Sequence, residues 1–180
     1  MIHTLKQLNL FLKTETEKYK KQKLIRFFGW LPMFMCFGEA FGIYKLLTYL
    51  RKCEYHTNRR TPLRIWYSLK LKSIQNRFCV RIPINVFDEG LQIPHLGPII
   101  VHPKCRVGKN CRIHVGVNIG AEKDMVPTLG DNCYIGPGAK LFGDIHIGND
   151  CKIGANAVVN KSFPDGTVIV GVPGHSVGEE

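Results

Sequence analysis

From about residue 80 onward, an aliphatic side chain recurs every six positions. In that frame the chain reads VGKNCR, IHVGVN, IGAEKD, then LGDNCY, IGPGAK, LFGDIH, IGNDCK, IGANAV and VNKSFP. Each unit opens on Val, Ile or Leu, and glycine follows in six of the nine. Such a period is typical of a solenoid in which each unit forms a short strand and a turn. Three units then make a triangular coil of about 18 residues.

A second inward position is expected four residues after each opening aliphatic, where the coil has room only for small groups. It is filled by Cys105, Cys111, Cys133, Ala139, Cys151 and Ala157. These cysteines therefore behave as small apolar fillers. The chain has seven cysteines and no CxxC pair, which argues against a disulfide framework or a zinc site and favours a reducing cytoplasm. Glycines and five asparagines suit the tight turns. The asparagines are Asn110, Asn118, Asn132, Asn149 and Asn156.

Residues 1–75 follow a different pattern, with apolar residues three and four positions apart among many Lys and Glu. That spacing predicts helices, interrupted between Gly29 and Pro32. We therefore expect a basic helical segment over residues 1–78 and a β-helix over residues 79–180.

Charge separates the same two parts. The net charge is +11, and residues 1–80 hold 16 Lys/Arg against 4 Asp/Glu. No zinc-finger or RNA-recognition motif accompanies these charges, so we expect no nucleic-acid partner. A solvated basic surface is the main expectation. The apolar run "FFGWLPMFMCFG" is too short to span a bilayer and reads as a buried or subunit-packed helix. Peripheral membrane contact through residues 20–50 is a weaker expectation.

The segments "LQIPHLGPIIV" and "GAKLFGDIHIGNDCKIGANAVVNKSFPDGTVIVGVPG" resemble the serine acetyltransferase family of hexapeptide-repeat acyltransferases. The closer resemblance is to its branch in polysaccharide and capsule biosynthesis. It implies a mainly β fold, a left-handed parallel β-helix of four to five triangular coils, preceded by the helical segment. It also implies a homotrimer, acetyl-CoA as co-substrate and a cytoplasmic location. Some related β-helices hold zinc with three histidines, but the histidine spacing here does not match, so no metal is expected.

His95 stands out because the six-residue count runs back from Ile119 through Ile113, Val107 and Val101 to a histidine. The count predicts that His95 occupies an inward slot at the expense of packing. By resemblance, the histidine of "IPHLG" is the general base that takes the proton of the acceptor hydroxyl. An imidazole suits this role because its pKa lies near physiological pH.

Three further residues are candidates around His95. His114 follows it by 19 residues and is expected on the neighbouring coil, either lining the site or facing solvent. The aspartate that orients the family's base is replaced by Val80, so Asp88 is the expected substitute, unless "FDEG" is only a polar turn. His102 falls on another side of the triangle and is expected to be structural.

The acceptor-binding positions depart from the family pattern. Pro94 stands where serine acetyltransferases carry an aspartate, and Met125 and Val126 replace an Arg-His pair that recognises the serine carboxylate. A carboxylate is best bound by a bidentate arginine. The sequence therefore favours a sugar or polysaccharide-precursor hydroxyl over serine. The loop between Ile119 and Leu129 is expected to protrude, because it spans ten positions where six would suffice.

The acetyl-CoA positions depart less from the family. By resemblance, small residues let the pantetheine arm lie in a groove between adjacent coils of two subunits. The matching positions are Gly120, Pro137, Gly143 and Ala155. Lys161 and Pro173 match the nucleotide end, where Lys161 would pair with a phosphate. Each glycine or alanine is equally well explained as a coil corner.

Together these observations predict an acetyl-CoA-dependent O-acetyltransferase that works by direct transfer in a ternary complex. No cysteine or serine is placed beside His95 as a nucleophile. Two alternatives stay open. One is serine O-acetylation in cysteine synthesis, and the other is a non-catalytic trimeric β-helix scaffold.

Overall fold

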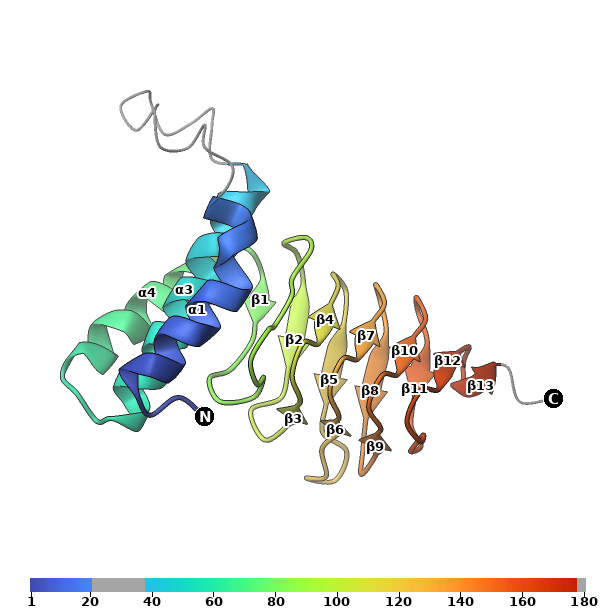
Figure 1. Cartoon of the computed structure of the whole chain (residues 1–180). Helices are drawn as coiled ribbons and strands as arrows, with labels where there is room; N and C mark the ends of the chain where they lie inside the picture. The colour runs from blue at the N-terminus through green and yellow to red at the C-terminus, as the bar shows by residue number, and fades with distance from the viewer. Residues whose placement is uncertain (21–37, 178–180) are drawn as a thin grey trace. The chain divides into compact units, whose positions relative to one another are not determined.

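The computed structural model describes residues 1–20 and 38–177. The chain divides into two compact units, Met1–Arg77 and Phe78–Glu180, and Figure 1 labels their elements. The first unit is helical and the second is a parallel β-helix, so the predicted fold class is confirmed.

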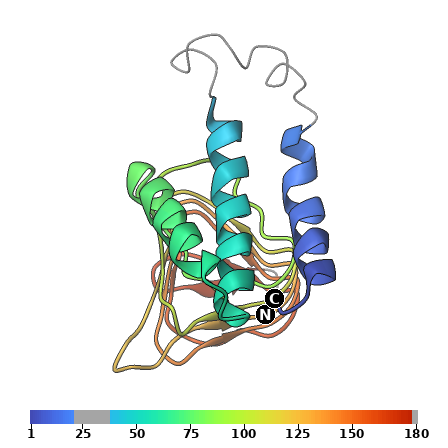
Figure 2. The same ribbon diagram turned by 90° about the vertical axis from the view of Figure 1, so that its left-hand side faces the viewer.

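The helical unit contains α1 (Leu5–Lys20), α3 (Glu39–Asn58) and α4 (Leu63–Arg77) within its described residues. Helix α3 contacts both others, and Figure 2 shows it between them. Ile2, Leu8 and Phe11 form a buried cluster against Tyr55 of α3. The expected helical spacing therefore serves to bury one face of each helix.

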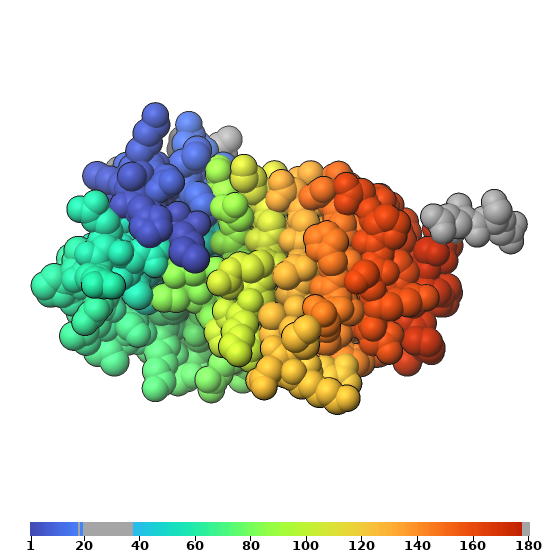
Figure 3. All heavy atoms as spheres, turned by 90° about the horizontal axis from the view of Figure 1, so that it is seen from below, coloured from blue at the N-terminus to red at the C-terminus, as the bar shows by residue number. Residues whose placement is uncertain are grey.

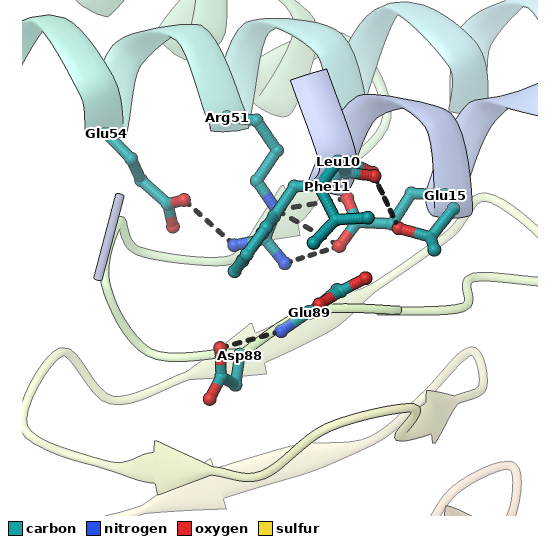
Figure 4. A network of polar contacts seen from close by, with 8 residues as sticks. Leu10, Phe11, Glu15, Arg51, Glu54, Asp88 and Glu89 are labelled. Carbon is teal, nitrogen blue, oxygen red and sulfur yellow. Dashed lines mark hydrogen bonds and ion pairs between the residues drawn. The ribbon is translucent and has the colours of Figure 1, made fainter. Parts of the chain in front are cut away.

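A fully buried arginine joins α1 to α3. Arg51 of α3 donates from Nε to both carboxylate oxygens of Glu15 in α1, at 3.1 and 3.0 Å. Its Nη2 lies 2.6 Å from Glu15 Oε1, and its Nη1 donates to Glu54 Oε2 at 2.8 Å (Figure 4). The guanidinium carbon also lies 4.8 Å from the Phe11 ring centroid. Two carboxylates thus compensate one buried cation, and the pKa of Arg51 is raised by them despite its burial.

Helix α4 has two apolar faces. Leu71 and Ile74 are buried, and the Tyr67 ring stacks on His56 of α3 at 4.8 Å. On the opposite face Ile65, Trp66 and Leu69 are exposed. None of the described helices is long and apolar enough to cross a bilayer. Residues 27–37 of the apolar run lie outside the described residues, so peripheral membrane contact stays a prediction.

The β-helix has three sides, which we name by their strands. Side A consists of β1 (Val80–Arg81), β2 (Ile99–Val101), β5 (Asn118–Gly120), β8 (Lys140–Phe142) and β11 (Val158–Val159). Side B consists of β3 (Arg106–Val107), β6 (Thr128–Leu129) and β9 (His146–Ile147). Side C consists of β4 (Arg112–Ile113), β7 (Tyr134–Ile135), β10 (Lys152–Ile153), β12 (Val168–Val170) and β13 (His175–Val177). Figure 2 shows the resulting triangular outline.

Both predicted inward positions are confirmed. The opening aliphatics stack in register, as in the column Ile113, Ile135 and Ile153 on side C, each fully buried. The second inward position is also fully buried. It comprises Cys105, Cys111, Cys133, Ala139, Cys151 and Ala157. The six described cysteines are all free thiols.

The prediction that asparagines occupy tight turns holds at four of its five positions. Asn110, Asn132 and Asn156 have positive φ of 54°, 58° and 58°. Asn110 and Asn132 are also linked along one corner by a side-chain hydrogen bond of 3.2 Å. Asn149 also lies in a turn, where its side-chain oxygen accepts the backbone N–H of Asp131 at 2.8 Å and the following Asp150 has the positive φ. The prediction was wrong for Asn118, which lies in β5.

The β-helix ends in a hairpin. Strand β13 pairs antiparallel with β12, with Ile169 opposite Ser176, whereas the other strand pairs of the described β-helix are parallel. Figure 3 shows the coils following one another in chain order from yellow to red up to this end. The segment "TVIVGVPGHSV" thus closes the stack as predicted, and its strand β13 covers the open edge of β12.

Cysteine accessibility gives a test of this packing. Alkylation of the native protein near pH 8 should modify Cys79, which is exposed, and spare Cys105, whose thiol pKa is raised to about 11 by burial. Mass-spectrometric mapping in a Cys36→Ser background, with Cys79→Ser as control, measures this. Rapid native modification of Cys105 or Cys133 would contradict the closed interior.

Candidate functional site

His95 lies at the corner between side C and side A. Gln92 forms a β-bridge with Arg112 on the next coil. Arg112 pairs with Tyr134, and Tyr134 pairs with Lys152. Three residues beyond Arg112, Tyr134 and Lys152 lie Val115, Pro137 and Ala155, which form one column at the corner. Pro98 extends this column on the preceding coil, because its carbonyl accepts the Gly116 N–H at 2.6 Å, and His95 lies three residues before Pro98. We call this column, His95 and the adjoining His114 the His95 corner. It brings together the predicted base and two of the predicted acetyl-CoA positions.

The expectation that His95 occupies an inward slot was wrong. Ile93 takes that slot and is fully buried, whereas the His95 side chain is exposed. The next opening aliphatic of the six-residue pattern is Val101 on side A, which lies eight positions after Ile93. The segment from Pro94 to Pro98 adds two residues to the corner, so the six-residue count slips there. Packing is not sacrificed, and the imidazole is available to solvent and to small molecules.

His114 lies on the neighbouring coil, as expected. Its ring centroid is 4.9 Å from that of Tyr134, and its Nε2 is buried without a hydrogen-bond partner among the described residues. Burial, followed by the positive charges of Arg112 and His95, lowers the pKa of His114. A neutral imidazole beside His95 can therefore donate or accept one hydrogen bond at neutral pH.

Asp88 and His102 lie elsewhere on the triangle. Asp88 follows the Phe87–Val107 bridge, at the corner between sides B and C, and its Oδ1 accepts the backbone N–H of Glu89 at 2.9 Å (Figure 4). The whole of side C separates it from His95, so the structure does not bring the two together within one chain. His102 follows β2 at the other end of side A, where its Nδ1 accepts the backbone N–H of Lys104 at 3.3 Å.

The predicted protruding loop is a short hairpin between β5 and β6. Glu122 and Met125 exchange two backbone hydrogen bonds of 2.9 Å. Between them, Lys123 and Asp124 both have positive φ, as a tight two-residue hairpin turn requires. Met125 is 48% exposed. In Figure 2 the gold trace of this loop extends beyond one corner of the triangle.

The remaining predicted acetyl-CoA positions divide between two other places. Gly120, Gly143 and Lys161 gather near the base of the hairpin, because Gly120 pairs with Phe142 and Leu141 with Val159. A Cβ at Gly143, where φ is +86°, would meet Glu122 Oε2 at 3.1 Å. Lys161 is exposed, with its Nζ 5.4 Å from the Phe163 ring centroid. Pro173 lies in the turn between β12 and β13.

Two residues that lie beside the His95 corner were not identified from the sequence. Tyr134 packs against His114, and the Arg112 guanidinium carbon lies 6.0 Å from the Tyr134 ring centroid. Tyr134 follows His114 by 20 positions, and only the coil register brings them together. A period of six does not show which outward residues become neighbours when one coil carries a hairpin insertion. No group of three or more metal-ligating side chains occurs within the described residues.

Comparisons with known proteins find relatives of the same fold. A family model described as "Bacterial transferase hexapeptide (six repeats)" matches residues 127–161. The curated serine acetyltransferase of Staphylococcus epidermidis strain RP62A is 33% identical over 146 residues. That match covers 77% of this chain and 66% of the relative, which is just under two thirds.

Two solved structures extend the likeness. Soybean serine acetyltransferase, as the apoenzyme, covers 96% of this chain with a TM-score of 0.71, and 69% of its own length is matched. Its 23% identity shows a common fold that includes the helices. A serine acetyltransferase in complex with CoA is 26% identical with a TM-score of 0.61, over 76% of this chain and 57% of that one.

Proposed function

We propose that this chain, a hexapeptide-repeat relative of the serine acetyltransferases, transfers the acetyl group of acetyl-CoA to the hydroxyl of a small acceptor. The observation that carries the proposal is the His95 corner. It presents an exposed imidazole at the same corner as Pro137 and Ala155, on a fold shared with a CoA-bound relative. Direct acyl transfer needs a general base within hydrogen-bond reach of the acceptor hydroxyl, and an exposed imidazole is accessible to such an acceptor.

The proposed mechanism follows from these side chains. His95 accepts the proton of the acceptor hydroxyl while its oxygen attacks the thioester carbonyl of acetyl-CoA. The tetrahedral intermediate then collapses, the carbon–sulfur bond breaks, and the departing CoA sulfur takes the proton from the imidazolium. An acyl-enzyme is not needed, and the cysteines of the coil interior are buried, with the Cys105 thiol pKa raised by that burial.

L-serine is the acceptor that we propose first. Serine as acceptor is supported by the curated and solved relatives, which are serine acetyltransferases. A sugar or polysaccharide-precursor hydroxyl is the second candidate. It is favoured by the hairpin, because Met125 and Val126 bring no charge to bind a carboxylate.

A homotrimer is part of the proposal. The predicted acetyl-CoA positions lie at two ends of side A, since Pro137 belongs to the His95 corner and Gly120 to the base of the hairpin. Neighbouring stacks would allow one chain to supply the His95 corner and the next chain the hairpin. The same proposal includes an ion pair between Lys161 and a phosphate of the bound CoA.

The acceptor is decided by one comparison. CoA release from acetyl-CoA, followed by chromatography, should rise when L-serine is added and not when a panel of sugars is added. Turnover of a sugar without turnover of serine would establish the second candidate. No CoA release with any acceptor, together with no acetyl-CoA binding in calorimetry, would overturn acetyl transfer. The non-catalytic trimeric scaffold would then be the favoured function.

A further inference from the structure

An arginine stands beside the His95 corner without a carboxylate partner. Arg112 opens β4, two residues before His114, and its side chain is exposed on the outward face of side C. It forms no ion pair among the described residues, in contrast to the buried Arg51 with its two glutamates. Its guanidinium carbon lies 6.0 Å from the centroid of the Tyr134 ring.

Tyr134 connects this cation to the histidines. The Tyr134 ring lies beside Arg112 and also beside His114. The centroids of the Tyr134 and His114 rings are 4.9 Å apart. The charges of Arg112 and His95 are both felt at His114, whose pKa they lower after burial. Gln92, three residues before His95, also forms a β-bridge with Arg112. Arg112, His114 and His95 therefore border one region of the surface.

An unpaired arginine on an aromatic ring is suited to a carboxylate. The guanidinium offers two parallel N–H donors that match two carboxylate oxygens, and the neighbouring Tyr134 ring restricts the space in which it can turn. L-serine carries its hydroxyl on the carbon next to the one that bears the carboxylate and the amine. A carboxylate held at Arg112 would thus keep the hydroxyl within a few bonds of the anchored end.

We propose that Arg112, oriented by Tyr134, binds the carboxylate of an amino-acid acceptor and so directs its hydroxyl toward His95. The inference rests on the proposed acetyl transfer. It specifies the acceptor as a hydroxyl compound that carries an α-carboxylate. In this account Arg112 determines acceptor specificity, Tyr134 is a positioning residue, and neither takes part in proton transfer.

The test compares L-serine with L-serinamide, which keeps the hydroxyl and amine but lacks the carboxylate. Arg112→Ala should raise KM for L-serine on the order of ten- to a hundredfold. It should leave kcat and the KM for acetyl-CoA within about threefold of wild type. The KM for L-serinamide should not change, so the preference for L-serine over its amide should disappear. Circular dichroism should show an intact fold, because Arg112 is exposed.

Matched variants separate this role from general charge. Lys152→Ala removes a cation from the same face of side C, one coil beyond Tyr134, and should leave the preference intact. Lys123→Ala removes the hairpin cation and should do the same. Tyr134→Phe keeps the ring and should behave like wild type, whereas Tyr134→Leu should weaken the preference for L-serine.

Three outcomes would overturn the inference. In the first, wild type acetylates L-serine and Arg112→Ala leaves its KM unchanged. In the second, Lys123→Ala and not Arg112→Ala removes the preference for the carboxylate. In the third, wild type acetylates only uncharged sugars. Acetyl transfer itself stands in all three cases, whereas a wild-type protein inactive with every acceptor would remove the proposed function as well.

Discussion

Replacing His95 with alanine should lower kcat for acetyl transfer by about 10²- to 10⁴-fold, the usual contribution of a positioned general base. The loss should appear in kcat more than in the KM for acetyl-CoA, because the imidazole acts on the acceptor proton. Thermal stability should stay within about 0.5 kcal/mol of wild type, since the side chain is exposed and Ile93 fills the interior slot.

His146→Ala is the matched control for that measurement. His146 is also exposed on the β-helix, on side B, where its Nδ1 lies 3.1 Å from Thr128 Oγ1. Its loss should leave turnover near the wild-type value. Equal activities of His95→Ala and wild type, with acetyl-CoA saturating, would remove His95 from the chemistry and transfer the question to His114.

The largest effect on stability is expected at Arg51. Arg51→Ala leaves the carboxylates of Glu15 and Glu54 buried without their cation, and losing one partner of a buried ion pair typically costs about 3–5 kcal/mol. The helical unit should therefore unfold at a lower denaturant concentration. Far-ultraviolet circular dichroism at the helical minimum during urea titration measures the change.

Lys72→Ala provides the comparison for Arg51. Lys72 is an exposed cation of α4, so its removal should change the free energy of unfolding by less than about 0.5 kcal/mol. Similar unfolding midpoints for Arg51→Ala and Lys72→Ala would contradict the buried network. Unchanged β-helix thiol protection in Arg51→Ala would show that the loss is confined to the helices.

The β-helix was predictable because its interior repeats a simple rule. An aliphatic residue and a small residue alternate in a fixed phase, and the coils stack those positions directly on one another, as Ile113 stacks on Ile135. Cysteine was interpretable for the same reason, since Cys133 and Ala139 occupy equivalent slots. Local residue pattern and global packing agree along this part of the chain.

The site was less predictable because it lies where the repeat is interrupted. The prolines around Gly97 lengthen one corner by two residues, which a fixed count of six turned into a false inward position for His95. The hairpin at Met125 lengthens another coil, so Val107 and Leu129 pair at a separation of 22 positions. Tyr134 and Arg112 became visible as neighbours of His114 only when that register was known.

The helical unit shows a different limit. Its amphipathic spacing predicts helices, but Arg51 and Glu15 are 36 residues apart, and neither the spacing nor the basic composition identifies them as partners. The sequence instead suggested a solvated basic surface. Buried charge pairs depend on which helices pack together, which is a tertiary property.

The most direct test of the account uses acetyl-CoA labelled in the acetyl carbon. Mass spectrometry should find the label on the hydroxyl oxygen of L-serine after turnover, dependent on His95, and should find none on the protein when acetyl-CoA is supplied alone. Labelled protein would contradict direct transfer and require a nucleophile on the chain. No labelled product with serine or any sugar would contradict the proposed acetyltransferase itself.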